Sequence, residues 1–175
     1  ADLEEERKKW SSEWRSALLE RIWQKFMIDE WQGIALLLPV VEESLRLFQF
    51  DLCETLLSQA EETNLAVPKH RDWLQFYWAL LAQMQGKLTI EEGTVRYANL
   101  LQTDDALLRC FVSYNLGEIA LAVGNYSEAE RRYESALEIW RSLNLPHSTF
   151  STRLMRQRAY IFRKRGIFDK ALVEY

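Results

Sequence analysis

The stretch Tyr114–Arg141, YNLGEIALAVGNYSEAERRYESALEIWR, determines how the rest of the chain is interpreted. In both of its halves, apolar residues recur every three or four positions, which is the spacing of one face of a helix. These positions are Leu116, Ile119, Ala120 and Val123, then Ala129, Tyr133, Ala136, Leu137 and Trp140. Gly124 and Asn125 separate the halves, and both residue types tolerate the positive φ that ends a helix. The stretch therefore predicts two amphipathic helices joined by a tight turn.

The same residues resemble a tetratricopeptide repeat. The matching positions are Leu116, Gly117, Gly124, Tyr126, Ala129, Tyr133 and Ala136. The pattern has a packing reason, because small residues stand where two helices must approach closely and large ones fill the space beside them. The resemblance implies an all-α fold, namely a right-handed α-solenoid of antiparallel helix pairs, which we expect to contain about nine helices.

Weaker copies of the pattern occur on both sides of this repeat. Gly166 follows Gly124 by 42 residues, and Gly86 precedes Gly124 by 38. Around Gly166 the pattern continues with Phe162, Phe168, Ala171 and Tyr175, and much earlier Phe50, Cys53, Leu57 and Ala60 fit a second helix. We therefore expect an N-terminal helical region over residues 1–69, made of a cap and a divergent repeat. Residues 70–175 would be tetratricopeptide-like repeats, the last one truncated.

Apolar periodicity and helix breakers predict the remaining helices. They span about residues 2–27, 29–48, 51–63, 70–85, 89–102 and 149–165, with a short ninth helix after Gly166. Asp51 and Thr103 are expected to be N-caps. The first helix carries an apolar stripe formed by Trp10, Trp14, Leu18, Ile22 and Phe26. We interpret this helix as a cap over the first repeat, with contact to a preceding domain as the alternative.

The bulk properties of the chain favour a folded protein without a membrane span. It has 175 residues, 48% of them hydrophobic, and a formal net charge of −4, which argues against general nucleic-acid binding. The longest apolar run, Ile34–Val41, is too short to cross a bilayer. No targeting segment is visible, so we expect a cytoplasmic protein, and we interpret the chain as a piece of a longer one. Cys53 and Cys110 are expected to be reduced core thiols.

No pattern of catalytic or metal-binding residues is present in the sequence. His70 and His147 are the only histidines, and neither has ligand spacing to the other or to a cysteine. The adjacent carboxylates Asp104-Asp105 and Glu91-Glu92 point about 100° apart on a helix, so they do not form an acid–base couple. We therefore expect no enzyme activity, no cofactor and no metal.

The resemblance also implies where a partner would bind. In tetratricopeptide repeats the first helix of each repeat lines a concave groove, and carrying those positions over gives eleven candidate residues. They are Trp73, Phe76, Tyr77, Phe111, Tyr114, Glu118, Arg153, Arg156, Tyr160, Arg163 and Lys164. The lysine and asparagine pattern of repeats that clamp chaperone tails is absent, because Tyr114 and Glu118 stand at two of its places.

The leading hypothesis is a protein–protein interaction module that binds a peptide or protein partner in this groove. Residues 152–175 hold seven Lys and Arg against Asp169 and Glu174, so an acidic-aromatic ligand is expected, with Trp73 and Tyr77 as apolar anchors. The alternative for the arginines is a solvated face. We also expect self-association through the truncated last repeat, through Phe168, Leu172 and Tyr175, and no nucleic-acid or membrane partner.

One further hypothesis concerns regulation. The early stretch Asp29–Glu62 loosely resembles the helical region that follows the ATPase in STAND-class signalling proteins. That resemblance implies a sensor within an ATP-dependent switch whose nucleotide site lies outside this chain. A third hypothesis is RNA binding through the arginine-rich C-terminal end.

Overall fold

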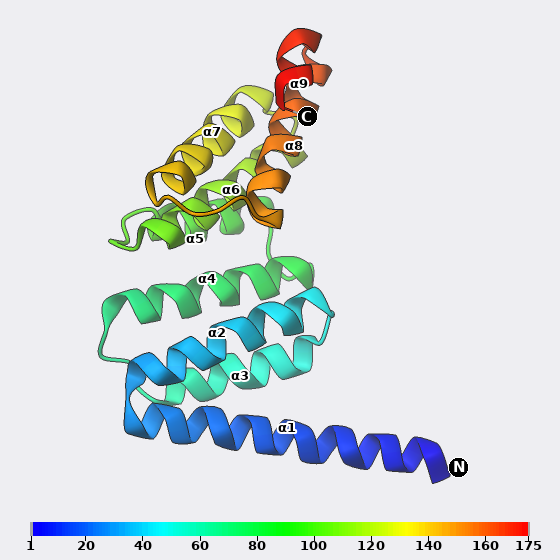
Figure 1. Ribbon diagram of the computed structural model, residues 1–175, viewed down its shortest axis with the longest axis vertical. Helices are drawn as coiled ribbons and strands as arrows, with labels where there is room; N and C mark the ends of the chain where they lie inside the picture. Colours follow the sequence, from blue (N-terminus) through cyan, green and yellow to red (C-terminus); the bar gives the residue numbers. More distant parts are fainter. Residues whose placement is uncertain (1, 175) are drawn as a thin grey trace. The chain divides into compact units, whose positions relative to one another are not determined.

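The computed structural model describes the backbone of residues 2–174 and the side chains of residues 12–173. Every regular element within this range is a helix, which confirms the predicted all-α class (Figure 1). The helices are α1 (Asp2–Ile28), α2 (Glu30–Arg46), α3 (Phe50–Glu62), α4 (Pro68–Met84), α5 (Ile90–Leu100), α6 (Ala106–Ala122), α7 (Tyr126–Ser142), α8 (Thr149–Lys164) and α9 (Phe168–Glu174). No helix among these residues is both long and apolar enough to cross a membrane. The side chain of Trp10 and all of Tyr175 lie outside the described residues.

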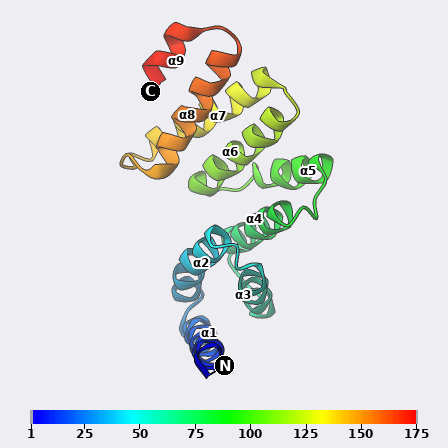
Figure 2. The same ribbon diagram turned by 90° about the vertical axis from the view of Figure 1, so that its right-hand side faces the viewer.

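The helices form two compact units, the first ending at Lys87 and the second beginning at Leu88. Within the first unit α2 packs against α1 and α3, and α4 packs against α3 and α2. Within the second unit α5, α6, α7, α8 and α9 pack each against the next, and α6 lies beside α7 in both views (Figures 1 and 2). Helix α4, which the sequence grouped with the later repeats, packs within the first unit, and the predicted domain boundary stays a prediction.

The turns after α4, α6 and α8 share one hydrogen-bonded form. Gly86, Gly124 and Gly166 each have a φ between 69° and 76°, in the left-handed region. The amide that follows each glycine bonds to a carbonyl five residues earlier, for example Asn125 N to Ala120 O at 2.9 Å. This geometry satisfies the last carbonyls of the helix and turns the chain sharply, which explains why glycine recurs there.

The turn between α2 and α3 has the same form without a glycine. Phe48 has a φ of 56°, and the next amide, Gln49 N, bonds to Ser44 O at 2.8 Å. Of the four residues that the sequence assigned to this divergent repeat, Cys53, Leu57 and Ala60 are buried on α3, whereas Phe50 is half-buried. The α2–α3 turn therefore adopts the same form with a phenylalanine in place of the glycine, and the predicted divergent repeat stays a prediction.

Replacing Phe48 with glycine should stabilise the first unit by about 1 kcal/mol, because a side chain in the left-handed region costs about 1–2 kcal/mol. The ring is 71% exposed, so little burial is lost, although its edge contact with Phe50 disappears. Urea denaturation followed by circular dichroism measures the change. Leu47→Gly is the matched control, because Leu47 has a φ of −92° and glycine there should only destabilise. A Phe48→Gly protein less stable than wild type would contradict the prediction.

The core of the second unit confirms the packing reason for the repeat pattern. Ala129, Tyr133 and Ala136 have no exposed surface, and they belong to one buried cluster with residues of α6 and α8. A Cβ atom added to Gly117 would lie 2.6 Å from the Tyr133 ring. Glycine is thus required at residue 117 because the ring occupies the space of a side chain.

Both cysteines lie in the cores, as predicted. Cys53 and Cys110 are free and buried, and burial raises the pKa of each thiol to about 12. The Cys110 thiol also donates to the carbonyl of Ala136 across the α6–α7 contact, at 3.1 Å. Neither residue is therefore a ready nucleophile.

Three details of the helices differ from the predictions. Asp105, not Thr103, caps α6, because its carboxylate accepts from Leu108 N at 3.0 Å. Helix α3 begins one residue before Asp51, and Gln49 is its N-cap residue. On α1, Ile22 is buried whereas Trp14 is 58% exposed, so the apolar stripe extends beyond the part of the helix that packs.

The last helix of the second unit presents apolar side chains to solvent. Phe168, Leu172 and Val173 on α9 are all strongly exposed. Neighbouring apolar side chains that are exposed in this way can pack against another protein surface. The predicted self-association stays a prediction.

Candidate functional site

The second unit contains a cleft between α6 and α8. Its volume is about 520 Å³, and it is lined by Tyr114, Glu118, Arg153, Arg156, Gln157, Tyr160 and Arg163. The first two residues lie on α6 and the other five on α8. The cleft is thus formed by the first helices of two successive helix pairs.

Local sequence fixes which face of α8 lines the cleft. Ser148 caps the helix, its hydroxyl accepting from Ser151 N at 3.3 Å while Ser151 Oγ accepts from Ser148 N. The buried residues of α8 are Ser151, Leu154, Ala159, Ile161 and Phe162. Because these buried residues pack against the core, Arg153, Arg156 and Arg163 face outward, and their helical spacing places them on one face.

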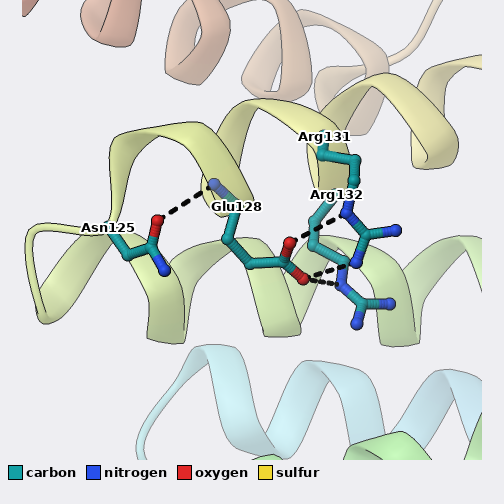
Figure 3. A network of polar contacts seen from close by, with 4 residues as sticks. All are labelled: Asn125, Glu128, Arg131 and Arg132. Atoms are coloured by element: carbon teal, nitrogen blue, oxygen red, sulfur yellow. Dashed lines mark hydrogen bonds and ion pairs between the residues drawn. The ribbon is translucent and has the colours of Figure 1, made fainter.

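Two arginines of α7 share one carboxylate partner. On α7, Arg131 binds both oxygens of Glu128 at 2.6 and 2.8 Å, and Arg132 reaches the same carboxylate at 2.7 Å (Figure 3). Asn125 fixes the start of this helix by accepting from Glu128 N at 3.2 Å. The hydrogen bond from Arg131 is the main reason that the pKa of Glu128 falls to about 2, although burial opposes the change.

Arg158 on α8 and Arg165, the C-cap residue of that helix, also have carboxylate partners on α7. Arg158 lies 3.8 Å from Glu134, and Arg165 pairs with Glu130. Arg153, Arg156 and Arg163, by contrast, have no ion pair among the described residues. Arg163 and Lys164 instead lie 5.6 and 5.5 Å from the ring centre of Tyr160. Three positive charges of the cleft therefore stay available to a ligand.

Glu118 is the one carboxylate that lines the cleft. Its Oε1 accepts from the hydroxyl of Tyr133 and from Nε2 of Gln157, the latter at 2.9 Å. Burial raises the pKa of Tyr133 well above its ordinary value, and the bond to Glu118 raises it further. Tyr133 is therefore a neutral donor that holds the carboxylate in place from the core side.

Tyr114 is also protonated at neutral pH. Burial raises its pKa to about 12, and the charge of Glu118 adds to this, while Arg153 and Gln157 act in the opposite direction. Its phenol is thus a hydrogen-bonding group at the edge of the cleft. The cleft thus combines hydrogen-bond donors, one carboxylate and three arginines. Among the described residues, no group of three or more His, Cys, Asp or Glu is placed to hold a metal ion.

Comparison with known proteins identifies a repeat family in the C-terminal part of the chain. Residues 109–175 match the family model described as tetratricopeptide repeat. These residues are tetratricopeptide repeats. Tetratricopeptide repeats generally serve as scaffolds for protein–protein interaction, which supports an interaction role for this part of the chain. No curated protein matches the sequence.

Two solved structures resemble the fold of the whole chain. BtubC (BKLC) from P. vanneervenii has a TM-score of 0.63 and 17% identity, over 91% of this chain and 67% of that one. MamA has a TM-score of 0.55 and 12% identity, over 96% of this chain and 88% of that one. At these identities the likeness concerns the fold alone.

The cleft brings together six of the candidate residues predicted from sequence. These are Tyr114, Glu118, Arg153, Arg156, Tyr160 and Arg163. Lys164 lies beside Tyr160. The rings of Phe111 and Phe150 pack edge to face, with their centres 4.6 Å apart. Gln157 was missed, although its place one residue after Arg156 and three before Tyr160 puts it on the same face.

The aromatic candidates of α4 are placed differently from the expectation. Trp73, Phe76 and Tyr77 are buried, and they pack against one another with ring centres 5.3–5.9 Å apart. Their positions in the repeat are those of the cleft residues on α8, but apolar side chains there join the core. We therefore do not assign them the role of exposed anchors.

Proposed function

We propose that the cleft between α6 and α8 binds an extended acidic segment of a protein partner. Arg153, Arg156 and Arg163 hold a carboxylate or phosphate of that segment, because a guanidinium fork matches the geometry of these groups. Tyr114 and Tyr160 supply aromatic contacts for an apolar or aromatic neighbour in the ligand. The proposal thereby adds a specific ligand chemistry to the general role of an interaction module.

One observation carries the proposal. The arginines facing α7 are matched by Glu130 and Glu134, whereas those lining the cleft have no carboxylate partner among the described residues. The positive charge of α8 is therefore left unmatched on the side that lines the cleft, where an acidic ligand could bind it. The looser hypothesis of a sensor in a STAND-class switch stays a prediction.

The test uses fluorescence anisotropy with a labelled, acetylated peptide that alternates glutamate and tyrosine. The variant Arg153→Glu/Arg156→Glu should weaken binding tenfold or more, because each reversal replaces attraction by repulsion. Binding to the wild type should also weaken as salt rises, since the Debye length falls from about 10 Å at 0.1 M to about 3 Å at 1 M. Circular dichroism should show an unchanged helical signal, because both side chains are exposed.

A matched control separates the cleft from net charge. Arg96→Glu/Arg141→Glu changes the net charge by the same amount at two exposed arginines that do not line the cleft. This control should bind the peptide nearly as well as the wild type does. Equal affinity of the cleft variant and the wild type would contradict the proposal and leave the arginines as a solvated face.

A further inference from the structure

The carboxylate of Glu118 is only partly used by the protein. Tyr133 and Gln157 both donate to Oε1, and Oε2 has no hydrogen-bond partner among the described residues. An ionised carboxylate accepts on both oxygens, with about four lone-pair sites in total. Glu118 is therefore held in place on one side and retains acceptor capacity on the side of the cleft.

The cleft also keeps opposite charges apart. No ion pair within 4.0 Å joins Glu118 to Arg153, Arg156 or Arg163 in the described part of the chain. The hydrogen bonds to Tyr133 and Gln157 hold the Oε1 side of Glu118 in place. The site thus presents a fixed negative group and three positive groups within one cleft of about 520 Å³.

We propose, on the basis of the function proposed above, that Glu118 determines specificity by selecting segments with a cationic nitrogen beside the acidic group. A lysine, arginine or free N-terminal amine of the ligand would donate to Oε2 while a carboxylate or phosphate occupies the arginines. A wholly acidic segment would instead place like charges against Glu118. Specificity of this kind combines an attraction to one ligand with a repulsion against another.

The competing explanation is that Glu118 serves only to orient Tyr133 and Gln157. The variant Glu118→Gln separates the two roles, because its side-chain oxygen can still accept from both donors while the negative charge is removed. The fold should therefore persist, which a thermal melt checks. Glu138→Gln is the matched control, since Glu138 is exposed on α7 and does not line the cleft.

The experiment compares two acetylated peptides by anisotropy titration. Both contain glutamate and tyrosine, and they differ only in a lysine of the first that is glutamine in the second. The wild type and Glu138→Gln should prefer the lysine peptide by a factor on the order of ten. Glu118→Gln should lose this preference, because the lysine of the first peptide loses its ionic contact with residue 118 while the glutamates shared by the two peptides are affected alike. Arginine and free-amine versions of the first peptide show which cationic group fits best.

Two results would overturn the inference while the proposed function stands. The first is equal binding of both peptides by the wild type, with binding still abolished by Arg153→Glu/Arg156→Glu. The second is a wild-type preference that Glu118→Gln retains. If the proposed function is wrong, the binding of neither peptide will depend on the arginines. The inference is then wrong as well.

Discussion

Replacing Tyr133 with alanine is expected to destabilise the second unit by about 3–5 kcal/mol, the usual cost of removing a large aromatic side chain from a core. The side chain is 0% exposed, and its ring fills the space left by Gly117. The ring also lies 5.7 Å from that of Tyr114. Because whole domains are stable by only about 5–15 kcal/mol, this change should bring the unit close to unfolding.

Urea denaturation followed by circular dichroism provides the measurement. Tyr133→Phe is the control that keeps the ring and removes only the hydroxyl, and it should cost about 1 kcal/mol. Since the hydroxyl donates to Glu118, the phenylalanine variant should also loosen that carboxylate and weaken peptide selection in the cleft. A loss below 1 kcal/mol for Tyr133→Ala would contradict the core position assigned to this residue.

Replacing Ala136 with leucine is the change with the second largest expected effect. Ala136 has no exposed surface, and its carbonyl accepts from the Cys110 thiol across the contact of α6 with α7. A leucine there adds three carbon atoms where no space exists, so it should destabilise the unit by about 1–3 kcal/mol. A thermal or urea melt gives the value.

The matched control for this overpacking is Glu138→Leu. Glu138 lies two residues further along α7 and is exposed, so leucine there should change the free energy of unfolding by less than about 0.5 kcal/mol. If both leucine variants melt like the wild type, Ala136 is not at a close helix–helix contact.

The helices and their close contacts could be predicted from the sequence because they depend on local and periodic signals. The spacing of apolar residues predicted the helices, and glycine residues predicted three of the turns. The small residues at positions 117, 129 and 136 predicted the close contact of α6 with α7. The turn at Phe48 escaped this reasoning, because nothing in the identity of a phenylalanine indicates a left-handed backbone.

The sequence by itself determined the all-α fold, the repeat family and six residues of the cleft, because helical periodicity fixes which side chains share a face. Only the tertiary structure decided which of those faces stay open. It buried Trp73, Phe76 and Tyr77, and it matched Arg158 and Arg165 with Glu134 and Glu130. It also placed Glu118 between Tyr133 and Gln157. Burial and charge pairing depend on neighbours distant in the chain, and no local pattern encodes them.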